Sequence, residues 1–316
     1  MIARQPLKAL FAAVLFSALV GPSSPANAYV RTRLSSTVPV QWANQCIPMV
    51  VHNAKPPAPL TPGSVLKATS AAASSWGRPG FTCTMLNITT TATAETDAPV
   101  GNDGTNRVAF REDRWCRYPA DAKGTCYDPS MVALTTMTAL ADGTIIDADI
   151  EVNAVDFKWA DRTEAGSKGQ DLQSALVHEF GHLIGLEHTC GVKSDVVVVD
   201  HAGRPVPACS VATAEQRAAI MYPAAASTSP LRRVLSADDA KAVCQIYAIR
   251  NTAPACRADA GVRDGGADAG VGVEVEGDEP VGCTLARGRQ EYSAGLLLLA
   301  FGLLALLRRT RVRASR

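Results

Sequence analysis

The stretch His178-Glu179-Phe180-Gly181-His182-Leu183-Ile184-Gly185-Leu186-Glu187-His188 decides how this chain is interpreted. It has the form H-E-x-x-H-x-x-G-x-x-H, and apolar residues recur at helical intervals within and before it. This periodicity predicts an amphipathic helix that starts near Gly169 or Asp171, with its apolar face turned inward. On such a helix His178 and His182 lie one turn apart on the same face, where two imidazoles can bind one metal ion.

Gly185 explains how a third histidine can reach the same ion. A helix continued to His188 would carry that side chain away from the first two histidines. Glycine adopts positive φ at little cost, so Gly185 can end the helix and turn the chain back. Three neutral imidazoles suit Zn2+ and leave a fourth tetrahedral position for water, which is typical of a catalytic site. Glu179 is expected to lie beside the ion, without binding it, as a general base.

The alternative is that these are ordinary residues of a helix face. It is disfavoured because three of the five histidines of the chain fall inside the motif. Imidazoles without partners would also make a poor core for a mostly apolar helix.

This motif resembles that of the metzincin zinc metallopeptidases. The resemblance implies a methionine turn beneath the zinc, and residues 219–223 (Ala-Ile-Met-Tyr-Pro) match it, with Met221 packed under the histidines. Alone, a buried methionine is usually only part of a core. The chain is most similar to the matrixin subgroup, because Thr189 follows the third ligand and Tyr222 follows Met221 directly.

The order of the predicted elements is similar to that of metzincins over roughly residues 30–249. We expect an α/β (α+β) fold with a twisted mixed sheet of about five strands, a first helix around Val65–Trp76, the zinc helix, the methionine turn and a C-terminal helix. That last helix has Ser236 as its N-cap, and the resemblance implies that one of its first-turn aspartates braces the methionine turn. The predicted strands are Val38–Trp42, Met85–Thr91, Arg107–Arg111, Val132–Thr138 and Ile145–Asn153.

Some expected metal sites of that family have no counterpart here. Only His52 and His201 lie outside the motif, and Asp147-Ala148-Asp149 replaces a D-A-H ligand pattern. We therefore expect one catalytic zinc and no second, structural zinc. Loop carboxylates suit Ca2+, but no EF-hand spacing supports a calcium site. The matrixin propeptide motif P-R-C-G-x-P-D is absent from the sequence, so latency by thiolate ligation is not supported.

The N-terminal residues 1–28 have the pattern of a secretory signal peptide. Arg4 and Lys8 precede the apolar run Ala9–Val20, and residues 26–28 (Ala-Asn-Ala) offer a cleavage site with small residues. An uncleaved anchor is the alternative. The pattern predicts a matrixin-like domain at 29–250, exported across the inner membrane.

The C-terminal part is predicted to attach the chain to the cell surface. Residues 251–282, rich in Gly, Ala, Asp, Glu and Val without periodicity, predict a flexible acidic linker. Residues 283–316 begin with Cys283, continue with a short apolar transmembrane helix at 292–307 and end in arginines. This order resembles the C-terminal sorting tails of myxobacterial surface proteins, which implies a sorting enzyme that acts near Cys283. A simple membrane anchor is the alternative.

Cysteine content and charge agree with export. Residues 29–307 contain 24 basic against 30 acidic residues, which argues against a nucleic-acid-binding protein. The even set of eight cysteines before the tail predicts disulfides, although eight cysteines allow 105 pairings. Two of them lie in residues 189–218, which we expect to form a disulfide-closed flap beside the cleft. The nearest-neighbour pairs would be Cys46–Cys83, Cys116–Cys126, Cys190–Cys209 and Cys244–Cys256.

The function implied is that of a secreted, surface-attached zinc endopeptidase that hydrolyses extracellular proteins or peptides. Water activated by zinc would attack the peptide bond, with Glu179 as general base. We expect an extended substrate to add a strand to the sheet edge near Ile145–Asn153. The alternatives are a catalytically silent surface binding module on the same fold, and an exopeptidase or hydrolase of another amide.

Overall fold

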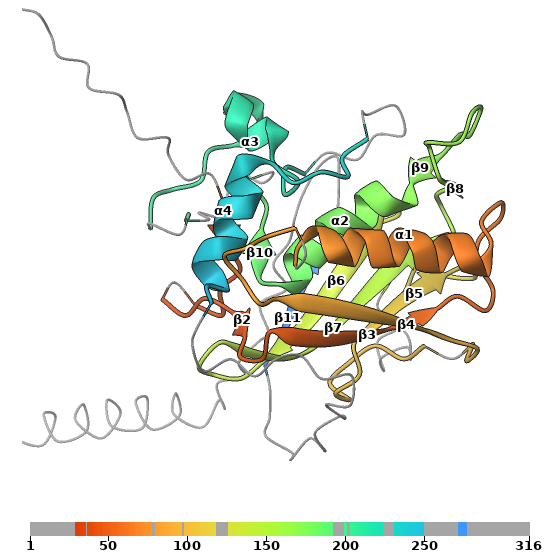
Figure 1. Ribbon diagram of the computed structural model, residues 1–316, viewed down its shortest axis with the longest axis horizontal. Coiled ribbons are helices and arrows are strands. Elements are labelled where there is room, and N and C mark those ends of the chain that lie inside the picture. Colours follow the sequence, from red (N-terminus) through yellow and green to blue (C-terminus); the bar gives the residue numbers. More distant parts are fainter. Residues whose placement is uncertain are drawn as a thin grey trace, which may run out of the picture.

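The computed structural model describes residues 29–35, 37–77, 80–96, 98–117, 126–191, 199–200, 203–223 and 231–249, together with the backbone of 271–276. One mixed β-sheet runs through the described part, and α1 and α2 lie side by side over one of its faces (Figure 1). This arrangement confirms the predicted α/β class. The helices are α1 (Pro62–Ser75), α2 (Leu172–Leu183), α3 (Ala214–Ala218) and α4 (Ala237–Ile246), with a 3-10 turn at Cys209–Val211.

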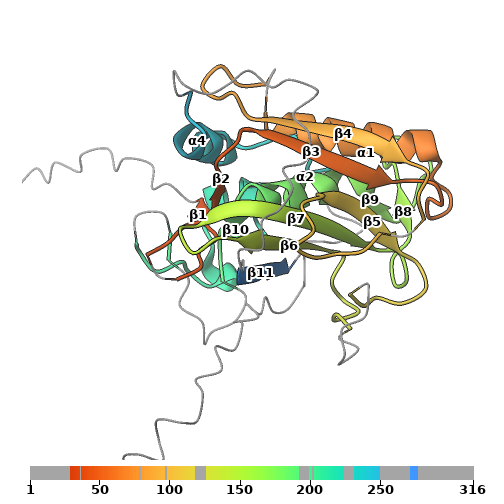
Figure 2. The same cartoon turned by 90° about the horizontal axis from the view of Figure 1, so that it is seen from below.

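The central sheet has the strand order β11-β6-β7-β5-β3-β4, and β2 also pairs with β7. Strands β4, β3, β5 and β7 are parallel, β6 is antiparallel to β7, and β11 is antiparallel to β6. Figure 2 shows β11 beyond β6 at one end of the sheet. The strands are β2 (Gln41–Trp42), β3 (Cys46–His52), β4 (Asn87–Thr93), β5 (Arg107–Arg111), β6 (Ala133–Ala139), β7 (Thr144–Asn153) and β11 (Val271–Glu276).

Most predicted strands are confirmed to within one or two residues at each end, and Arg107–Arg111 agrees at both. The exception lies at Val38–Trp42, where only Gln41–Trp42 forms a strand (β2) and Pro39 makes an isolated bridge with Arg33; the full strand β3 was not predicted. Proline is depleted from central strands, and Pro48 in the middle of β3 argues against one. The structure accommodates Pro48 because β5 joins β3 only at Val50 and Val51. The Pro48 carbonyl accepts a hydrogen bond from the Asn106 side chain instead, at 2.9 Å.

Helix α1 begins with a capping box, in which Thr61 and Ser64 exchange side-chain and backbone hydrogen bonds. Its inward face carries Val65, Ala72 and Ala73, which are buried in the core shared with α2 and the sheet. The chain after it places Trp76 in that core, where its indole Nε1 donates to the Val177 carbonyl at 2.6 Å. This bond ties the two helices together, so the position of α2 over the sheet is set partly by α1.

Three disulfides are described, and they test the nearest-neighbour pairing. The pairs Cys116–Cys126 and Cys190–Cys209 are confirmed. The predicted pairs Cys46–Cys83 and Cys244–Cys256 are wrong, because Cys83 is bonded to Cys244 of α4 across a sequence separation of 161 residues. The segment of Cys83 and the end of α4 meet through a bridge between Thr84 and Ala248, a contact that sequence spacing does not indicate.

Several predictions concern residues outside the described part. These are the signal peptide at 1–28, the sorting tail at 283–316 with its helix at 292–307, and most of the linker at 251–282. Within that linker, Val271–Glu276 form the strand β11 rather than irregular chain. No helix among the described residues is long and apolar enough to cross a membrane.

Candidate metal centre

Helix α2 carries the first two histidines and starts where the sequence predicts. Asp171 is its N-cap, and its Oδ1 accepts a hydrogen bond from the backbone N–H of Ser174 at 2.8 Å. Apolar side chains on one stripe of α2 are buried against the sheet and α1, as expected for an amphipathic helix. His178 and His182 are buried as well, one turn apart.

Gly185 turns the chain back after α2, as predicted. Its φ is +86°, and a Cβ at this position would lie 2.6 Å from the Val40 carbonyl oxygen. The helix ends at Leu183, and the Gly185 N–H donates to the His182 carbonyl at 2.7 Å. The following strand β10 (Leu186–Glu187) pairs with β1 (Val30–Arg31), which holds the returning chain in place. His188 thereby arrives beside the two histidines of α2.

The three histidines meet at their Nε2 atoms. The Nε2–Nε2 distances are 3.0 Å between His178 and His188, 3.0 Å between His178 and His182, and 3.2 Å between His182 and His188. The Nδ1 atom of His178 lies 2.8 Å from the Ile220 carbonyl, and that of His182 lies 2.9 Å from the Leu186 carbonyl. Carbonyls only accept, so these Nδ1 atoms carry the protons and the Nε2 lone pairs converge.

This geometry fits a metal ion. Converging lone pairs repel unless a cation lies between them, and imidazole nitrogens are ligands that zinc binds. Burial lowers the pKa of His178 to about 4 and, with the neighbouring imidazoles, lowers the pKa of His188 well below its usual value. Neutral imidazoles are the form that binds metals. The cluster His178, His182 and His188 could therefore hold a metal ion.

Glu179 is buried next to the first ligand, and a residue of β6 orients it. Its Oε2 atom accepts a hydrogen bond from the Thr135 hydroxyl at 2.6 Å. Sequence analysis did not identify Thr135, because the two residues are 44 positions apart and a threonine in a strand carries no signal of its own. The bond fixes one carboxylate oxygen at the end of β6 that lies under α2.

Met221 lies under α2, as the resemblance implied. It is buried, and a Cβ added to Gly181 would collide with the Met221 sulfur and the Trp76 ring. The glycine between the two α2 histidines is therefore what allows the methionine to pack so closely. The Thr189 N–H donates to the Met221 carbonyl at 3.0 Å, which ties the turn to the residue after the third histidine.

Asp239 braces this turn from α4. Its Oδ2 accepts hydrogen bonds from the Ile220 N–H at 2.8 Å and from the hydroxyl of the N-cap Ser236 at 2.7 Å. The Ile220 carbonyl faces His178, so α4 positions a metal-ligand candidate through the backbone of a single residue, Ile220. Arg232, which was not predicted, donates to the carbonyls of Ala219 and, at 2.9 Å, Tyr222.

The sheet edge beside the cluster is not the predicted one. Strand β7, which contains Ile145–Asn153, is an interior strand between β5 and β6. The strand beside α2 on the outer side is β6, and its outer partner is β11. The expectation of an edge at 145–153 is wrong. β6 comes before β7 in sequence but pairs with it on the side away from β5, so β7 has a neighbour on each side.

The predicted flap is closed by Cys190–Cys209, with part of it outside the described residues.

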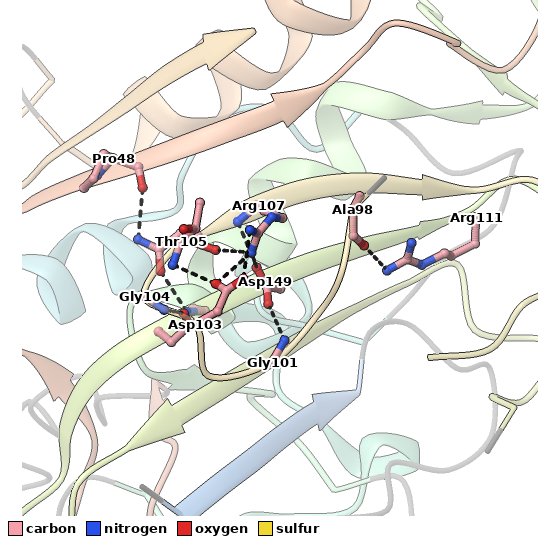
Figure 3. A network of polar contacts seen from close by, with 12 residues as sticks. Pro48, Ala98, Gly101, Asp103, Gly104, Thr105, Arg107, Arg111 and Asp149 are labelled. Atoms are coloured by element: carbon pink, nitrogen blue, oxygen red, sulfur yellow. Dashed lines mark hydrogen bonds and ion pairs between the residues drawn. The ribbon is translucent and has the colours of Figure 1, made fainter. Parts of the chain in front are cut away.

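On the face of the sheet away from α2, two aspartates of β7 hold the loop before β5, and Figure 3 shows one of them, Asp149, beside Gly101 and Arg107. Asp149 accepts from the N–H groups of Gly101 at 2.9 Å and Arg107 at 3.0 Å, and Asp147 accepts from Gly104 at 2.7 Å. Burial raises the pKa of Asp147 to about 7 and that of Asp149 to about 8. The residues that stand in place of the D-A-H pattern thus anchor a loop through its backbone.

Comparison with known proteins adds no assignment to this site. No protein-family model matches the chain, and no curated protein is significantly similar to it. The interpretation of the cluster therefore depends on its own geometry and chemistry.

Proposed function

We propose that this chain is a secreted, cell-surface-attached zinc endopeptidase whose folded domain is of the metzincin type, closest to the matrixins. The observation that carries the proposal is the convergence of three buried Nε2 atoms, 3.0–3.2 Å apart, on the helix and turn that also present the buried Glu179 carboxylate. Secretion and surface attachment rest on the sequence patterns at the two ends of the chain.

In this proposal the three histidines bind the metal ion and Glu179 transfers the proton. His178, His182 and His188 would hold zinc through Nε2, with a coordination position left for water or substrate. When bound there, zinc supplies Lewis acidity, which brings the pKa of water toward 7 and stabilises negative charge on oxygen. Glu179 would accept a proton from the attacking water and pass it to the leaving amine. Thr135 positions the carboxylate for that transfer.

The surroundings of the cluster support the metzincin assignment. Met221 packs beneath the helix of the first two ligands, and Asp239 and Thr189 connect its turn to the ligand set. A buried carboxylate beside three imidazoles is a typical arrangement for a general base next to a metal site. The same fold without hydrolysis would be a zinc-dependent binding module.

The test combines zinc content with peptide hydrolysis. Glu179→Gln is compared with Glu164→Gln, a matched substitution on an exposed loop. The parent chain and the control are expected to bind one zinc per chain and to digest casein or a peptide library. Glu179→Gln should keep its zinc and lose activity by about 10²–10⁴-fold.

Two outcomes would contradict the proposal. Unchanged turnover in Glu179→Gln would remove the general-base role. A chain that holds one zinc but hydrolyses no peptide would be the binding module instead.

A further inference from the structure

The outer edge of β6 is covered by a segment from the far end of the chain. Strand β11 pairs antiparallel with β6 over six residues, from Val271 opposite Ala139 to Glu276 opposite Leu134. With β11 in place, all seven residues of β6 are buried, although β6 would otherwise be the edge strand of its sheet. Figure 2 shows β11 alongside β6, on the side away from β7.

This edge is next to the candidate catalytic residues. Thr135, which holds Glu179, stands opposite Val275 in the register of the two strands. Antiparallel partners have their Cα atoms about 4.5–5.5 Å apart, so β11 lies one strand spacing from the residue that orients the carboxylate. A free β6 edge would offer unpaired N–H and C=O groups to any extended peptide that enters beside the metal centre.

We propose that Val271–Glu276 is an intramolecular occupant of this peptide-binding edge and competes with substrate for it. That substrate competes with β11 rests on the proposed function, but the pairing of β11 with the β6 edge can be tested without it. Residues 250–270 tether β11 to the end of the folded domain at Ile249. Because β11 belongs to the same chain as β6, it competes as an intramolecular ligand, and a substrate would bind this edge mainly when β11 leaves it.

The key variant removes the ability of β11 to pair without shortening the chain. Val273→Pro/Val275→Pro replaces two strand residues by proline, which has no backbone N–H and is strongly disfavoured in paired strands. Ala267→Pro/Ala269→Pro is the matched control, with the same two-residue spacing in the same acidic segment but outside β11. A chain that ends at Gly270 is a second variant that keeps the eight cysteines before the tail.

The first measurement is binding of a labelled peptide with the sequence of residues 270–277, Gly-Val-Gly-Val-Glu-Val-Glu-Gly, followed by fluorescence anisotropy. The strand variant and the chain ending at Gly270 should bind it at least ten times more tightly than the parent chain and the control. Equal binding by all four chains would overturn the inference. This readout needs no hydrolysis, so it remains decisive even if the proposed function fails.

The second measurement is peptide hydrolysis by the zinc-loaded chains. The strand variant should lower KM about tenfold with kcat unchanged, and the added 270–277 peptide should inhibit it competitively. Equal KM for the strand variant and the control, in chains that do hydrolyse the substrate, would also overturn the inference. Absence of hydrolysis in every chain, with the binding difference intact, would refute only the proposed function.

Discussion

On one face of the central sheet, three buried histidines direct their Nε2 atoms at one another; on the other face, Asp147 and Asp149 of β7 direct their oxygens at backbone N–H groups. The two clusters are equally buried. The two clusters differ in the groups that their polar atoms contact. The carboxylates accept hydrogen bonds from the loop before β5. The imidazoles of His178 and His182 contact backbone carbonyls through Nδ1, and all three imidazoles face one another through Nε2.

This difference separates a structural cluster from a ligand site. Burial of a polar group is unfavourable unless a complementary partner is present. The loop at 101–107 provides that partner for the aspartates, so their role is to hold the loop (Figure 3). The three histidines instead converge at their Nε2 atoms, an arrangement that could hold a metal ion. The comparison can be tested from both sides.

The largest effect is expected from removing one imidazole. His182→Ala should weaken zinc binding by more than about 100-fold, because one of the ligands that together contribute about 10–16 kcal/mol in structural sites is lost. His52→Ala is the matched control, since His52 is also a buried histidine but lies at the end of β3. Zinc content after dialysis against buffered zinc measures the difference. Equal zinc content in the two variants would mean that the convergence of the rings has another cause.

A smaller effect is expected at the turn that delivers His188. Gly185→Ala should destabilise the protein by about 1–3 kcal/mol through its positive φ and further through the contact with Val40, and zinc affinity should fall about tenfold. Gly166→Ala controls for the backbone effect, because its φ is +78° with no atom within 4 Å of the added Cβ. Urea unfolding measures the change in the free energy of unfolding, and zinc titration measures the change in zinc affinity. If Gly166→Ala were as harmful to zinc binding, the turn at Gly185 would have no special role.

The smallest effect concerns the aspartate face. The pKa of Asp147, raised to about 7 by burial, exceeds the value near 3.9 of an unfolded aspartate. The folded chain therefore binds the extra proton between about pH 4 and 7, and its unfolding free energy falls as pH rises through that window. Asp147→Asn should flatten this dependence.

Urea unfolding of the zinc-free parent chain and of zinc-free Asp147→Asn at pH 5 and pH 8.5 checks this prediction. The buried histidines, whose pKa values are lowered, contribute equally in both chains, so the difference between the chains reports on Asp147. An identical pH dependence in the parent chain and in Asp147→Asn would assign the titration to another group.

Local signals in the sequence were sufficient for the helix and its turn. The helical spacing of His178 and His182, the cap at Asp171 and the glycine at position 185 act within a few residues of one another, and all are found as predicted. The capping box of Ser236 at the start of α4 is another local signal that the structure confirms. Strand β3 was not predicted because Pro48 is unfavourable within a strand. Its pairing with the distant strand β4 nevertheless makes Cys46–His52 a strand.

Contacts between distant residues could not be predicted in the same way. The bond between Thr135 and Glu179, the disulfide Cys83–Cys244 and the pairing of β11 with β6 all join segments far apart in sequence. Each depends on how the sheet is ordered, and strand order is not encoded in the spacing of any one segment.

The sequence by itself determined which residues can form a three-histidine site, because helical periodicity and the permissive φ of glycine act over one or two turns. Only the tertiary structure decided that the rings converge, that Thr135 and Asp239 orient them and their neighbouring carboxylate, and that β6 rather than β7 borders the site. Those outcomes depend on packing between helices and sheet, where the burial of many side chains together selects one arrangement.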